Sequence, residues 1–97
     1  MEIQINAIHF DMTEKLHAFV NKKAEKLANH YPFVTNFEAN MKVVKAETAL
    51  NKEAKVILCV PQRDDLVATK VCDTFEEAID TAIRALEPQL EKYKDKK

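Results

Sequence analysis

Lysine side chains recur along the segment 13–30, whose apolar residues repeat at the spacing of a helix. Lys15, Lys22 and Lys26 are separated by seven and four residues, which places them within about 40° of arc on a helical wheel. Lys23 lies at the nearby edge of the apolar stripe. Long cationic side chains beside apolar surface are suited to phosphate contacts along a nucleic-acid backbone, although a solvated basic flank has the same pattern.

Carboxylates dominate the second segment with helical periodicity, 73–91, where Arg84 is the single base. Glu76, Glu77 and Asp80 could form a carboxylate cluster for acid–base chemistry. Acidic residues in the first turn of a helix also stabilise its N-terminal dipole, and we favour this structural interpretation. A longer acidic row motivates a separate hypothesis, in which this helix binds a basic protein partner; its members are Glu76, Asp80, Glu87 and Glu91.

Positive charge returns only at the end of the sequence, where Lys92, Lys94 and Lys96 precede the terminal Lys97. These lysines either complement the negative C-terminal end of the helix dipole or bind a polyanion together with the lysines of 13–30. We expect residues 92–97 to form a basic tail that frays from the helix.

The remaining chemistry-bearing residues match no catalytic or metal-binding motif. His9, His17 and His30 are scattered, and none has the spacing of a zinc-binding helix. A zinc site that joins Cys59 and Cys72 to a histidine across two strands is an alternative, but we expect ordinary half-buried thiols. The sequence contains no glycine, which excludes phosphate-binding loops that depend on glycine turns. We therefore expect neither enzymatic activity nor a bound cofactor or metal.

Hydrophobic periodicity indicates which elements position these residues. Helices are predicted over 13–30, with Asp11 or Thr13 as N-cap, and from Thr74 onward, where Pro88 should kink or split the helix. Alternating polar and apolar residues predict four strands, over 2–8, 37–43, 54–60 and 66–72. The segment 47–52 is expected to be a hairpin loop.

The resulting order is β-α-β-β-β-α, which predicts an α+β fold with a four-stranded mixed sheet in a single domain over residues 1–97. The first helix is long enough for a crossover that makes the first two strands parallel, and the later strands follow as an antiparallel meander. Each helix has one apolar stripe, so both should cover the same sheet face and leave the other face to water.

Composition excludes several classes of protein. Lys and Arg number 15 against 16 Asp and Glu, and this net charge of −1 argues against a strongly basic nucleic-acid-binding protein but allows a local basic patch. The longest uncharged apolar run, 56–60, is far shorter than the roughly 20 residues of a membrane-spanning helix. No signal segment opens the sequence, so we expect a cytoplasmic protein with neither a membrane nor a small-molecule substrate among its partners.

The order and spacing of several motifs resemble those of the ribosome hibernation factors, also called ribosome-associated inhibitors or sigma-54 modulation proteins. The resemblance covers nearly the whole sequence and is greatest to the short, hibernation-promoting type. It rests on the opening strand and on the motifs Met12-Thr13-Glu14-Lys15-Leu16-His17-Ala18-Phe19-Val20, Lys23, Lys26-Leu27, Met41-Lys42-Val43-Val44-Lys45, Asp73-x-Phe75-x-x-Ala78-Ile79-Asp80, Gln89-Leu90-Glu91-Lys92 and Lys94-Asp95-Lys96.

This resemblance implies a non-enzymatic translation inhibitor that occupies the mRNA and tRNA channel of the small ribosomal subunit in stationary phase or stress. It also implies contacts to ribosomal RNA through basic side chains of both helices, and ribosome pairing with the help of a separate small ribosome-dimerising factor. Lys23, Lys26 and Lys92 match basic positions of the family, whereas Ala85 and Pro88 stand where the family usually has bases. The full set of expected RNA-binding residues is Lys15, Lys22, Lys23, Lys26, Lys92, Lys94 and Lys96.

Overall fold

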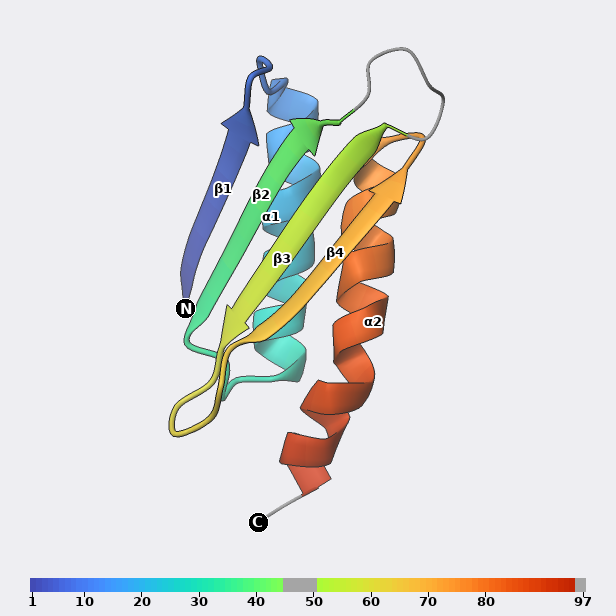
Figure 1. The fold of residues 1–97 in the computed structure, drawn as a ribbon. Coiled ribbons are helices and arrows are strands. Elements are labelled where there is room, and N and C mark those ends of the chain that lie inside the picture. The colour runs from blue at the N-terminus through green and yellow to red at the C-terminus, as the bar shows by residue number, and fades with distance from the viewer. Residues whose placement is uncertain (45–50, 96–97) are drawn as a thin grey trace.

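A computed structural model describes the backbone of residues 1–44 and 51–95, and the side chains of these ranges as far as Tyr93. Its elements pack as one sheet backed by two helices (Figure 1). In chain order these elements are β1 (Glu2–Ile8), α1 (Glu14–His30), β2 (Asn36–Val43), β3 (Lys52–Cys59), β4 (Leu66–Cys72) and α2 (Phe75–Asp95). This order confirms the predicted fold class.

The four strands form one mixed sheet in the order β1-β2-β3-β4. β1 pairs with β2 in parallel, and the pairs β2–β3 and β3–β4 are antiparallel, as the length of the first crossover predicts. The register places Ile5 opposite Ala39, Ala39 opposite Val56, and Val56 opposite Ala68. Because directly opposed residues point to the same face of a sheet, these rows form the apolar face on which the helices pack.

A threonine side chain caps the N-terminus of each helix. The Thr13 hydroxyl accepts a hydrogen bond from the Leu16 backbone N–H at 3.1 Å, and the Thr74 hydroxyl accepts one from the Glu77 N–H at 3.1 Å. Thr13, and not the competing Asp11, is therefore the N-cap of α1.

The core lies between the sheet and the two helices, because each helix turns one apolar stripe toward the sheet. From α1 and the residue after it, the stripe contributes Leu16, Val20, Ala24, Leu27 and Tyr31. From α2 it contributes Phe75, Ala78, Ile79, Ala82, Ile83, Leu86 and Leu90. These side chains are buried, as predicted from the periodicity, whereas Met12 and Phe19, which the same stripe of the first helix was predicted to include, are half-buried and pack against the core. Within 1–44 and 51–95, no helix is both long and apolar enough to cross a membrane.

The other face of the sheet is open to water, as predicted. It carries polar side chains that bond to each other across the strands: Asn6 donates from Nδ2 to Asn40 Oδ1 at 2.8 Å, and the Lys42 ammonium lies 3.5 Å from a Glu53 carboxylate oxygen. In Figure 1 this open face is toward the viewer and both helices lie behind the sheet. The functional side chains on the helices are thus separated from this face by the whole sheet.

Three details differ from the sequence-based expectations. Lys52 belongs to β3, where it pairs with Val43 and Cys72, so its assignment to the hairpin loop was wrong; residues 47–50 of the predicted loop lie outside the described ranges. Of the two outcomes predicted for Pro88, a kink or a split, the split does not occur, because α2 runs as one helix through Asp95. Residues 92–95, expected to be part of a frayed tail, are thus helical, and residues 96–97 are not described.

The absence of glycine requires two other residues to adopt a left-handed backbone. His9, after β1, has a φ of 62°, and Gln62, in the turn between β3 and β4, has a φ of 63°. Such a conformation costs a residue with a Cβ about 1–2 kcal/mol. The chain therefore accepts some local strain at both ends of the sheet to make its turns without glycine.

A pair of valine substitutions tests which face of the sheet is buried. Val56 is fully buried in β3, so Val56→Ala should lower the free energy of unfolding by about 2–3 kcal/mol through lost burial and a residual cavity. Val67 on the open face of β4 is 48% exposed, and Val67→Ala should cost about 1 kcal/mol or less, mainly through strand propensity. Urea unfolding of both variants measures the difference, and equal losses would contradict the assignment of the faces.

Candidate functional site

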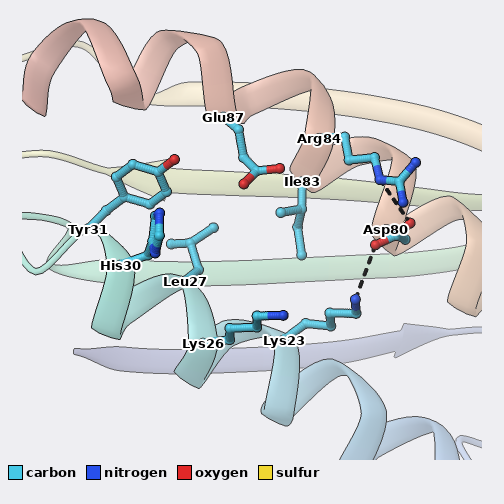
Figure 2. Close-up of a pocket in the computed structure, with 9 residues that line it drawn as sticks. All are labelled: Lys23, Lys26, Leu27, His30, Tyr31, Asp80, Ile83, Arg84 and Glu87. Atoms are coloured by element: carbon cyan, nitrogen blue, oxygen red, sulfur yellow. Dashed lines mark hydrogen bonds and ion pairs between the residues drawn. The ribbon is translucent and has the colours of Figure 1, made fainter.

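A groove of about 270 Å³ runs between α1 and α2 on the side of the helix layer away from the sheet (Figure 2). The two helices run in the same direction, because both return along the sheet from the same end of it (Figure 1). Leu27 and Ile83 supply apolar surface to the groove, and its charged side chains come from both helices (Figure 2). The remaining lining residues are Lys23, Lys26, His30, Tyr31, Asp80, Arg84 and Glu87.

Asp80 joins the two helices through an ion pair with a lysine of α1. Its Oδ1 lies 3.1 Å from Lys23 Nζ, and its Oδ2 lies 3.2 Å from Arg84 Nε, one helical turn further along α2. Lys23 also lies over the Phe19 ring, with its ammonium 5.5 Å from the ring centre. One carboxylate thus holds two cations, so this group of three charges has a net charge of +1.

The far end of the groove is closed by a hydrogen bond. Tyr31, the residue after α1, donates from its hydroxyl to Glu91 Oε2 at 2.6 Å. Burial raises the pKa of the Tyr31 hydroxyl well above its usual value, and the Glu91 carboxylate raises it further, because ionisation would place two negative charges side by side. This bond ties the end of α1 to the last turns of α2.

The structure places the predicted lysines in different surroundings. Lys15, Lys22 and Lys26 are exposed on α1, and Lys26 also lines the groove, whereas Lys23 is half-buried and paired with Asp80. Lys92 is exposed on the last turns of α2. The side chain of Lys94 and all of Lys96 lie outside the part of the chain that the structure describes.

The lysines of α1 and those of the chain end do not form one continuous basic surface. Glu87 lines the groove beside the α1 lysines, and Glu91 lies further along α2, bonded to Tyr31. Lys92 is twelve residues beyond Asp80, which corresponds to about 18 Å along a helix. The described lysines of the two helices therefore lie in two places, along α1 and at Lys92 near the end of α2, with the carboxylates of Glu87 and Glu91 between them.

Sequence reasoning missed both arginines. Arg84 appeared only as the single base of an acidic helix, yet the fold places it in the groove that Lys23 and Lys26 also line. Its spacing of four residues from Asp80 was a usable signal for an ion pair on one helix. Arg63, from the β3–β4 turn, lies with its guanidinium 4.9 Å from the centre of the Tyr93 ring, a contact for which the sequence held no signal.

The alternative zinc site is ruled out by the register of the sheet. Cys72 pairs with Lys52 at the start of β3, whereas Cys59 ends the same strand, so the two thiols lie seven residues apart along it. Their neighbours show that they also face opposite sides: Cys72 packs against the core, and Cys59 alternates with the buried Leu58. Both cysteines are half-buried and free, and burial raises the pKa of the Cys59 thiol. Among the described residues, no cluster of three or more His, Cys, Asp and Glu could hold a metal ion.

The sequence is similar to proteins of known families over almost its whole length. Residues 3–97 match the family model described as sigma 54 modulation protein / S30EA ribosomal protein. A ribosome hibernation promoting factor of Pseudomonas putida strain KT2440 is 29% identical over 96 residues, which cover 99% of this chain and 89% of that protein. A second Pseudomonas putida protein with the same name has the same identity and coverage.

Solved structures share the fold. A ribosomal subunit interface protein from Coxiella burnetii superposes with a TM-score of 0.82 at 23% identity, and the match covers 99% of this chain and all of that one. The N-terminal domain of Thermus thermophilus Protein Y superposes with a TM-score of 0.72 at 20% identity, over 96% of this chain and 99% of that one.

A titration tests the hydrogen bond that closes the groove. Because the pKa of Tyr31 is raised in the folded state, the unfolded chain loses its tyrosine proton first, at about pH 10. The stability that this bond contributes is therefore complete below about pH 10 and is lost as the pH rises further. Tyr31→Phe should lower the free energy of unfolding by about 1 kcal/mol at pH 7 and flatten its fall above pH 10. Urea unfolding across pH 8–11 measures both effects.

The matched control is Tyr93→Phe, which alters the other tyrosine of the chain and leaves the Tyr31–Glu91 bond intact. This variant should retain the fall in stability at high pH. An unchanged profile for Tyr31→Phe would contradict the assigned bond.

Proposed function

The chain belongs to the sigma 54 modulation protein / S30EA ribosomal protein family, and on this premise we propose that it is a ribosome-binding inhibitor of translation. It acts in stationary phase or stress by occupying the channel for mRNA and tRNA on the small ribosomal subunit. The match over residues 3–97 is the observation that carries the proposal, supported by two relatives named ribosome hibernation promoting factor. The function is one of binding, with ribosomal RNA as the ligand.

The outer surface of α1 is the favoured contact with RNA. Lys15, Lys22 and Lys26 are exposed there, on the face of α1 opposite the buried stripe that packs on the sheet. Their ammonium groups can reach phosphates of structured RNA, where recognition depends on shape and backbone charge more than on base edges. The net charge of the whole chain is −1, so a local cluster must provide the attraction.

The second helix contributes fewer cations than the family pattern implies. Ala85 and Pro88 are both exposed on α2, on the strip that ends at Lys92, and neither can contact a phosphate through a charge. Each missing phosphate contact removes one released counterion. We therefore expect weaker binding and a flatter salt dependence than a relative with bases at both positions would show.

A protein-interaction module that uses the acidic row of α2 is the competing function. Two of its four carboxylates are already engaged within the fold, since Asp80 pairs with Lys23 and Arg84, and Glu91 accepts the bond from Tyr31. This engagement favours the ribosome-binding function.

Sedimentation of a stationary-phase lysate through sucrose gradients at two salt concentrations separates the two functions. Co-migration with ribosomes at low salt that is lost at high salt supports the proposal, because the contact is electrostatic. A protein that stays at the top of both gradients contradicts it and favours the interaction module. The same gradients report ribosome pairing, for which we propose the help of a separate small factor in the cytoplasm.

Charge reversal on α1 tests the proposed contact surface. Lys22→Glu with Lys26→Glu should weaken association with purified ribosomes strongly and reduce the slope of log K against log salt by roughly 1.4–1.8, for two lost phosphate contacts. Lys55→Glu with Lys42→Glu places the same charge change on the open sheet face and should leave binding nearly unchanged. Equal effects of the two pairs would contradict a defined surface.

Restoration of the missing bases is the converse test. Ala85→Lys with Pro88→Arg adds two cations to the exposed strip of α2 and also restores an N–H that can bond to the Arg84 carbonyl. Association with ribosomes should tighten, with a salt slope steeper by roughly 1.4–1.8. Unchanged affinity in the folded double variant would show that this strip does not face RNA.

A further inference from the structure

We propose that Arg84 is the phosphate-binding residue of α2 and that Asp80 orients it, an inference that rests on the proposed ribosome-binding function. Arg84 is one of two arginines in the chain and the only base between Asp73 and Glu91. It lies on the groove side of α2, across from the lysines of α1 (Figure 2). The fold thereby brings a base of α2 to the surface that the α1 lysines occupy.

The geometry of Arg84 leaves its terminal nitrogens available. Its side chain is 75% exposed, and its contact with Asp80 is made through Nε. Within the described part of the chain, Asp80 is the one residue that pairs with this guanidinium, so most of the group faces solvent. A guanidinium held at Nε presents a planar fork of donors that matches two oxygens of a phosphate.

Asp80 acts as a positioning residue. Its carboxylate is only 33% exposed and contacts both Lys23 Nζ and Arg84 Nε, so it fixes the direction in which the more exposed arginine extends. Lys23 is held on its other side by the Phe19 ring and is half-buried, which leaves its ammonium less free to contact a phosphate. Of the two cations that share Asp80, Arg84 is therefore the better phosphate contact.

Arg84 compensates in part for Ala85 and Pro88, from the α1 side of their strip. Successive residues of a helix are rotated by about 100°, so Arg84 lies roughly 40° from Pro88 and roughly 100° from Ala85 on the helical wheel, and it also lines the groove toward α1. The carboxylate of Glu87 lines the same groove and disfavours a phosphate deep inside it. We therefore place the phosphate at the solvent edge of the groove, between Arg84 and Lys26.

Removal of the arginine charge tests the contact. Arg84→Gln should weaken association of the 97-residue chain with purified ribosomes about five- to tenfold and reduce the salt slope by roughly 0.7–0.9, for one phosphate. Arg84→Lys keeps the charge but not the fork, so it should recover the salt slope and only part of the affinity. Lys55→Gln, with the same charge change on the open sheet face, is the control and should match the wild type.

The orienting role of Asp80 has its own measurement. The two arginine Nε–H groups can be followed by ¹⁵N NMR, where Arg63 serves as an internal reference because it does not contact Asp80. In Asp80→Asn, the heteronuclear NOE of Arg84 Nε should fall while that of Arg63 stays unchanged. An unchanged Arg84 signal would overturn the positioning role.

The outcomes separate this inference from the function on which it rests. Absence of ribosome binding by the wild type at low salt overturns both. A second outcome overturns the role of Arg84 and leaves the proposed function standing. In it, Arg84→Gln binds ribosomes normally with an unaltered salt slope, whereas Lys22→Glu with Lys26→Glu loses binding. The role of Arg84 is also overturned if Arg84→Gln loses affinity without a change in salt slope while its stability in urea equals that of the wild type. The reason is that loss of a phosphate contact must change the number of counterions released on binding.

Discussion

The parallel pairing of β1 and β2 is the constraint on which the functional surface depends. A parallel neighbour forces the chain to cross the sheet between the two strands, and α1 makes that crossing. The antiparallel strands that follow return α2 to the same sheet face and in the same direction (Figure 1). The middle of α1 therefore meets the second turn of α2, and residues 57 positions apart, Lys23 and Asp80, form an ion pair.

In the groove between the helices, one carboxylate, that of Asp80, forms ion pairs with two cations. Asp80 neutralises part of the positive charge of Lys23 and Arg84 and holds both side chains in place. An exposed pair of this kind contributes little to stability, on the order of 0–1 kcal/mol, so its main effect is on geometry. The burial of Leu27 and Ile83, which line the groove from the two helices, contributes to the energy that keeps the helices together.

The proposed ribosome binding by a protein with a net charge of −1 requires that its charges be separated in space. The open sheet face carries paired and polar groups such as Lys42 with Glu53, while the free cations of α1 lie on the far side of the molecule. Tyr31 and Arg63 contact the last turns of α2 from two different elements, through Glu91 and Tyr93. These contacts hold the end of α2, and with it Lys92, against the rest of the fold beyond Pro88.

The sequence by itself determined the order of the elements, their apolar stripes, the strands 2–8 and 66–72, and the family, because periodicity and motif spacing are local properties of a chain. It predicted the start of β3 and the continuity of α2 past Pro88 less well, since strand pairing at Lys52 and the contacts that hold the last turns of α2 depend on partners distant in sequence. It placed lysines on α1, but only the tertiary structure decided that Lys23 is engaged by Asp80 and that Arg84 joins the groove. The physical reason is that a helical wheel shows only which residues of one helix share a face. Which residues of the other helix that face contacts depends on how the two helices pack on the sheet.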